Sequence, residues 1–192
     1  MRLLLLMFLN LSLLGGDEVT WHWKSPSTKI EAESKFVEAD TPRVIWLYEP
    51  DNPAKKERLC SFERDAELIF SPDDSMVAMN DIVGSDLAEI RLFKRVNGLH
   101  YQELSTQVHD LCWALLQKRK KVPYPKALLH SYAFVKQWSP DSSAFLVNLS
   151  GHTDSNQYVE DWLCVFDLRT NRPTLDLSVL NRKSVIFRAS PR

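Results

Sequence analysis

The chain has 192 residues, a hydrophobic fraction of 44% and a formal net charge of −1 at pH 7. This length and apolar content suffice for one domain with its own core and exclude a wholly disordered chain. The near-neutral charge leaves no strong electrostatic field to attract nucleic acid or an anionic membrane surface, so we expect neither as a partner.

Residues 1–16, MRLLLLMFLNLSLLGG, have the pattern of a secretory signal peptide. A basic residue, Arg2, precedes an apolar run, and two small residues follow the run. The run is too short for a membrane-spanning helix, which needs about 20 apolar residues. We therefore expect residues 17–192 to be exported, periplasmic or secreted, without stable membrane insertion. A buried first helix is the alternative interpretation.

Three similar segments follow the leader, each with an aromatic residue, a Ser-Pro pair and two strand-like stretches. Residues 21–64 contain WKSPSTKIEAES and RVIWLYEP, residues 65–104 contain IFSPDDSMVAMN and AEIRLFKR, and residues 127–180 contain QWSPDSSAFLV and DWLCVFDL. Proline presets φ in a turn, and serine and aspartate side chains bind free turn amides. Each Ser-Pro pair is therefore predicted to form a turn between two antiparallel strands.

Residues 105–122, between the second and third segments, have the spacing of an amphipathic helix. Ser105 or Thr106 can cap its start, the basic run KRKK suits its end, and Pro123 stops it. We expect its apolar stripe to face the core; the stripe consists of Val108, Leu111, Cys112, Leu115 and Leu116.

The turns and the strands after them resemble the WD40-like, TolB-type β-propeller repeats, whose blades carry an aromatic-Ser-Pro-Asp-Gly turn. FSPD and WSPD match this motif, although Asp74 and Ser142 stand where glycine is usual. The resemblance implies a mainly β fold with three propeller-like antiparallel blades in residues 17–192, one inserted α-helix, and a partial fourth blade begun at Ser190. Closed propellers have at least four blades. Three blades in an open stack would leave an exposed lateral face. The alternatives are an imperfect closed arrangement, a helix that covers one side, oligomerisation, or a shortened gene product.

The sequence contains no constellation that fixes an activity. It has no nucleophile elbow, no glycine-rich phosphate loop and no H-E-x-x-H motif, so we predict no catalytic residue and no cofactor. Polar side chains gather in the loop around His152 and Asp154, and two aromatic residues, Trp21 and Trp23, share one face of a strand. These four are the candidate binding residues. The loop is interpreted as solvated rather than as a metal site.

Cys60, Cys112 and Cys164 have neither the spacing of a redox motif nor that of a zinc site. Their neighbours are apolar, which favours buried thiols for at least one of them, and their odd number excludes complete pairing within one chain.

Together these features predict an exported, non-enzymatic binding or assembly module that recognises a protein or a glycan through loops at the ends of its blades. Two alternatives remain open. One is a hydrolase with a site around His152, and the other is a structural accessory subunit that completes a larger propeller.

Overall fold

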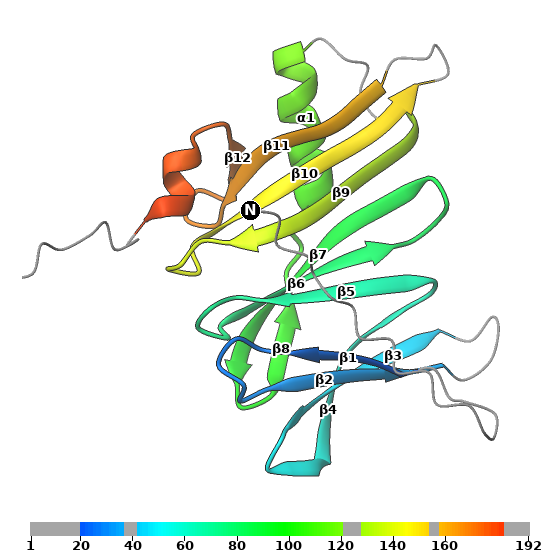
Figure 1. Ribbon diagram of the computed structural model, residues 1–192, viewed down its shortest axis with the longest axis vertical. Helices are drawn as coiled ribbons and strands as arrows, with labels where there is room; N and C mark the ends of the chain where they lie inside the picture. The colour runs from blue at the N-terminus through cyan, green and yellow to red at the C-terminus, as the bar shows by residue number, and fades with distance from the viewer. Residues whose placement is uncertain (1–19, 37–41, 121–127, 154–157, 183–192) are drawn as a thin grey trace, which may run out of the picture.

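The computed structural model describes residues 20–36, 42–120, 128–153 and 158–182. These residues form a mainly β fold (Figure 1). The predicted leader, the turn at Ser190 and the candidate residue Asp154 lie outside the described residues.

Within the described residues, twelve strands form three four-stranded antiparallel meanders, which follow one another along the chain. The first contains β1 (Thr20–Lys24), β2 (Glu31–Lys35), β3 (Arg43–Glu49) and β4 (Asn52–Phe62). The second contains β5 (Asp65–Phe70), β6 (Met76–Ile82), β7 (Leu87–Asn97) and β8 (His100–Glu103). The third contains β9 (Leu128–Trp138), β10 (Ala144–Thr153), β11 (Tyr158–Asp167) and β12 (Arg172–Thr174). A short parallel pairing of β7 with β9 joins the second and third meanders into one sheet.

The meanders lie one above another, with an apolar layer between each neighbouring pair (Figure 1). The middle meander contributes to both layers, because successive residues of a strand point to opposite faces. On β6, Val77 and Met79 belong to the layer shared with the first meander, and Met76 and Ala78 to the layer shared with the third. This double burial explains why β6 is apolar along most of its length rather than alternating.

The three Ser-Pro turns have the same structure, which confirms the predicted strand-turn-strand repeat. Ser25, Ser71 and Ser139 are buried, each between the first and second strands of a meander. Each serine N–H donates to the carbonyl five residues ahead, at 2.9, 2.9 and 2.8 Å, and each serine carbonyl accepts from the N–H three residues ahead, at 2.9, 3.0 and 3.0 Å. Each hydroxyl oxygen also accepts from the N–H five residues ahead.

The fourth residue of each turn lies in the left-handed region of backbone conformation. Thr28, Asp74 and Ser142 have φ values of 62°, 58° and 58°. This is the position at which the resembling repeats carry glycine, and the conformation explains that preference, because a Cβ atom is unfavourable there.

Successive turns also bind one another. The Ser27 hydroxyl in the first turn donates to the Asp74 carboxylate in the second, and the Asp73 N–H in the second donates to the Ser142 hydroxyl in the third, at 3.3 Å. The third residue of one turn thus contacts the fourth residue of the next. These contacts align the corresponding ends of the three meanders.

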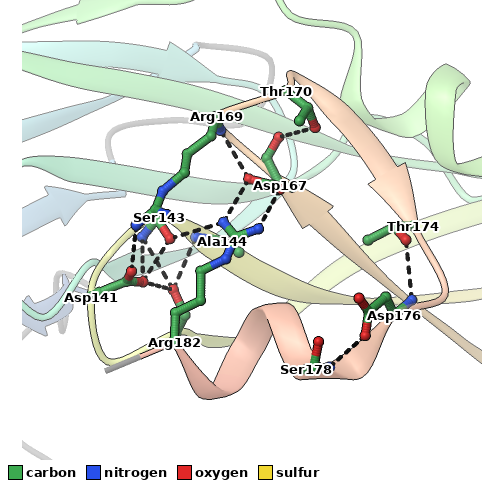
Figure 2. Close-up of polar contacts among 11 residues, drawn as sticks. Asp141, Ser143, Ala144, Asp167, Arg169, Thr170, Thr174, Asp176, Ser178 and Arg182 are labelled. Carbon is green, nitrogen blue, oxygen red and sulfur yellow. Dashed lines mark hydrogen bonds and ion pairs between the residues drawn. The ribbon is translucent and has the colours of Figure 1, made fainter. Parts of the chain in front are cut away.

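The third turn is also bound by the end of its own meander, as Figure 2 shows. Arg169 donates to Asp141 at 2.8 Å, and Arg182 makes two hydrogen bonds to Asp167, at 3.1 and 2.8 Å. Arg182 follows a 3-10 helix, η2 (Leu177–Asn181), whose Val179 packs against the outer face of the third meander. One end of that outer face is therefore covered.

The predicted helix forms as α1 (Val108–Lys120) and is the one α-helix in the described part of the chain. It lies between the second and third meanders, not over an open end of the stack. The predicted apolar stripe was wrong at Leu111, which is 37% exposed, and Leu115 is only half-buried. Trp113 and His109 are buried instead, because the helix packs against both the second and the third meander and turns its largest side chain into the apolar layer between them.

Replacing Leu116 by alanine should lower the free energy of unfolding by about 2–5 kcal/mol, because Leu116 is buried in this layer. Leu111→Ala is the matched control and should cost less than about 1 kcal/mol. Urea unfolding followed by tryptophan fluorescence measures both. Equal losses would contradict the observed orientation of α1.

Replacing Thr28 by glycine should raise the free energy of unfolding by about 1 kcal/mol, because the β-branched side chain is exposed and its backbone is left-handed. Thr28→Ala retains the Cβ atom at the same φ and should change stability by less than about 0.5 kcal/mol. If the glycine variant were less stable than the wild type in the same urea assay, the left-handed backbone at Thr28 would not be strained.

Candidate functional site

The two outer faces of the stack differ in chemistry. On the first meander the outer face is charged and its charges are paired: Lys24 binds Glu31 at 2.7 Å, and Lys56 binds Glu33 at 2.5 Å. The Tyr48 hydroxyl also donates to Glu31 at 2.9 Å. This face resembles the polar outer surface of a terminal repeat in a stacked protein.

The outer face of the third meander carries a continuous row of rings, which we call the aromatic face. Adjacent rings along the row have centroids 6.3, 5.9, 4.3 and 5.5 Å apart, and all four pairs are stacked or tilted. In order, the rings belong to Phe134, Tyr132, His130, His152 and Tyr158.

Strand alternation and register together build this row. On β9, Ser131, Ala133 and Val135 are buried on the inner side, so His130, Tyr132 and Phe134 point outward. The register of β10 then places His152 opposite both His130 on β9 and Tyr158 on β11. Three strands thereby contribute rings to one surface.

Gly151 permits the close approach of β9 and β10 beside the row. A Cβ atom added there would overlap the His130 carbonyl oxygen and would lie 3.1 Å from the Trp113 ring. The position therefore accepts no larger residue without moving one of the two strands.

The two histidines are in direct polar contact. His130 Nδ1 lies 3.1 Å from His152 Nε2. One ring nitrogen must donate and the other must accept, so at least one imidazole of the pair is neutral while this hydrogen bond exists.

The aromatic face is open to solvent and extends into aliphatic surface. Tyr158 is 64% exposed, and Leu163, which is on the same outer side of β11, is 45% exposed. Lys136 lies over the Phe134 ring at 5.5 Å from its centroid. Neighbouring exposed apolar side chains of this kind are characteristic of interaction surfaces.

Of the three predicted binding residues that the structure describes, only His152 lies on the aromatic face. Trp21 and Trp23 do share one face of β1, as expected, but that face points toward the second meander. The Trp21 ring packs edge-on against Phe62 at 6.3 Å, with Arg43 over its face, and Trp23 packs against the first apolar layer. These packing contacts account for both tryptophans.

The sequence interpretation missed His130, Tyr132, Phe134 and Tyr158. A signal for three of them was present in HSYAF, where a ring occurs at every second residue of a strand. The fourth residue, Tyr158, joins the row through the register between β10 and β11, which no local sequence pattern shows.

A second constellation lies on the inner side of β9. His109 Nε2 is 3.3 Å from the Ser131 hydroxyl, and His109 Nδ1 is 3.0 Å from the Asp110 carboxylate. This is the connectivity of a serine-hydrolase triad. Its environment differs from that of a catalytic triad, because Ser131 and His109 are both buried. The Ser131 N–H donates to the Asp86 carbonyl oxygen, so this N–H cannot bind an oxyanion.

The three cysteines are reduced and buried, whereas the sequence predicted this for at least one of them. Burial raises the pKa of Cys60 to about 12. Contact with Cys164, together with burial, raises the pKa of Cys112 well above its ordinary value. Neither of these two thiols is a reactive thiolate at neutral pH. Within the described ranges, no group of three or more histidine, cysteine or acidic side chains could hold a metal ion.

Comparison with known proteins finds similarity among solved structures. No protein-family model matches the chain, and no curated protein matches it. Among solved structures, TolB from Acinetobacter baumannii is similar with a TM-score of 0.40 and 12% sequence identity, over 81% of this chain. The chain spans 43% of the TolB chain. None of the helices in the described residues is long and apolar enough to cross a membrane.

A fluorophosphonate probe, which phosphonylates activated serines with loss of fluoride, should not label Ser131 in the folded protein, because Ser131 is buried and its amide is engaged. Mass spectrometry of the intact protein measures the adduct, with a known serine hydrolase as positive control. An adduct that Ser131→Ala abolishes would contradict this expectation and identify the chain as a serine hydrolase.

Proposed function

We propose that the chain is an exported, non-enzymatic binding module that docks a partner protein on the aromatic face. The observation that carries the proposal is the row of five contacting rings on the outer side of the third meander, ending at the exposed Tyr158. Aromatic side chains are enriched in protein interfaces, where they bury a large area at a small cost in side-chain entropy.

The neighbouring side chains favour a protein over a glycan. Leu163 and Leu146 lie on the same outer side of the third meander as the rings. Leucine adds contact energy against an apolar protein surface but offers no hydrogen bond to a sugar hydroxyl. A surface that mixes tyrosine, histidine and leucine therefore suits a protein whose contact region is apolar with a polar rim.

An accessory role in a larger propeller is the second candidate function. If the three meanders are propeller-like blades, a further blade would stack on one of the two outer faces. The paired charges on the first meander disfavour stacking there, because an apolar sheet would desolvate them. The aromatic face supports this candidate, since its rings form a contacting row without the paired charges of the first meander.

The proposal predicts that Tyr158→Ser weakens binding of the partner by about 30-fold, the loss typical of an interface hot spot. Trp46→Ser is the matched control: Trp46 is 39% exposed on the first meander and should have no effect. Partners are captured from the exported fraction with the mature chain, and binding is then measured with each purified partner by calorimetry.

Three outcomes would contradict the proposal. If the Tyr158→Ser protein binds every purified partner with the same affinity as the wild type, the aromatic face is not part of the interface. A dimer that light scattering detects and that Tyr158→Ser dissociates would make a second copy the occupant. Binding to a glycan array that depends on Tyr158 would replace the protein partner by a carbohydrate.

A further inference from the structure

A pocket of about 230 Å³ lies where the first and second meanders meet. It is lined by the end of β4, the end of β6 and the middle of β7, so it opens at the end of the meanders opposite the Ser-Pro turns. Three apolar residues, Pro42, Phe62 and Val83, form part of its wall. A cavity of about 150 Å³ holds benzene, so this pocket has room for a ligand with several carbon atoms.

The charged side chains of the pocket are unevenly matched. Asp81 is buried in the wall, and Arg91 donates to its Oδ2 at 3.1 Å. The same guanidinium makes two hydrogen bonds to the Glu103 carboxylate, at 2.8 and 2.9 Å, and one to the Ser61 carbonyl oxygen, at 2.9 Å. One positive charge therefore serves two carboxylates.

Two neighbouring side chains leave this imbalance in place. Glu63 also lines the pocket and adds a third carboxylate. The Arg43 guanidinium donates to the main-chain carbonyl oxygens of Glu63 and Arg64, so these hydrogen bonds bring its charge to no carboxylate. The pocket is therefore suited to a cation rather than to an anion, for which its one guanidinium is already engaged.

The Asp81 carboxylate has an oxygen available to a ligand. Arg91 binds Oδ2, and no side chain or amide among the described residues donates to Oδ1. Burial, above all, raises the pKa of this carboxyl, and the charges of Glu103 and Glu63 add to the effect, so that Arg91 does not offset it. A second cation in the pocket would therefore stabilise the ionised carboxylate.

We infer that this pocket binds a primary ammonium group on an aliphatic stem, with Asp81 as its main acceptor. An ammonium group brings one positive charge and three N–H donors, and its hydrogen bond to a carboxylate is charge-assisted. The stem would lie against the apolar part of the wall. A free alkylamine and the lysine side chain of another protein share this chemistry.

The test is an NMR titration of the ¹⁵N-labelled mature protein with n-butylammonium chloride at constant ionic strength. The amide signals of residues 61–63 and 81–83 should shift and saturate together. Asp81→Asn should weaken binding at least about tenfold, because asparagine can still accept from Arg91 but lacks the charge. Asp51→Asn removes an exposed carboxylate outside the pocket and should leave the affinity unchanged. Tetramethylammonium, which has the charge but no N–H donor, should bind more weakly than butylammonium.

A second variant keeps the test decisive if Asp81→Asn does not fold. Val83 is 39% exposed at the rim, so Val83→Lys should retain the fold and compete for the pocket with its own ammonium group. Thermal unfolding measures the fold of each variant. Absence of saturable shifts in the wild type, or wild-type affinity in both folded variants, would overturn the inference.

A second probe, Nα-acetyl-lysine N-methylamide, distinguishes the two sources of the ammonium group. If it displaces butylammonium, the pocket accepts the lysine side chain of a protein; if only butylammonium binds, the pocket accepts a free amine. Tyr158→Ser should bind butylammonium as the wild type does, because the aromatic face shares no residue with the pocket. The docking proposal and this inference therefore fail independently.

Discussion

The hydrogen bonding of the Ser-Pro turns is the constraint on which the arrangement of the sheets depends. Each serine holds the residue five positions ahead through both its backbone and its hydroxyl, so the first two strands of every meander start from the same register. A one-residue slip would move each apolar side chain to the opposite face. The contacts from Ser27 to Asp74 and from Asp73 to Ser142 then align the three meanders, and the apolar layers form between matching faces.

This stacking leaves two outer faces without a neighbouring meander, and the two faces carry different side chains. On the first meander, lysine and glutamate pairs occupy the outer side of β1, β2 and β4. On the third, η2 covers one end and the aromatic face fills the other. Surface ion pairs add little stability, but they make it costly to bury that face beneath another sheet. The outer face of the first meander therefore carries paired charges, and the outer face of the third carries the aromatic face. Under the proposed function, a partner binds to the third meander.

The sequence predicts the turns and the helix because their signals are local. Proline, serine and the preceding aromatic residue lie within a few positions of one another, and the helix has start and stop signals at its two ends. The buried side of α1 could not be predicted, since the helix packs against two meanders at once and Trp113 outweighs the regular spacing that favoured Leu111. The orientation of Trp21 and Trp23 likewise depends on which side the second meander occupies. Alternation within HSYAF could have indicated the aromatic face, but its completion by Tyr158 requires the register of a distant strand.

Strand β9 shows how one sequence segment supplies two unrelated polar arrangements. Ser131 points inward to His109 on α1, while the adjacent His130 points outward to His152. The inner contact is enclosed between sheets, so it satisfies a buried imidazole and holds the helix against the third meander. The outer contact lies on an accessible surface, where the same kind of side chain remains available to a ligand. Burial, rather than residue type, therefore separates the histidine that stabilises the fold from the pair that lies on the aromatic face.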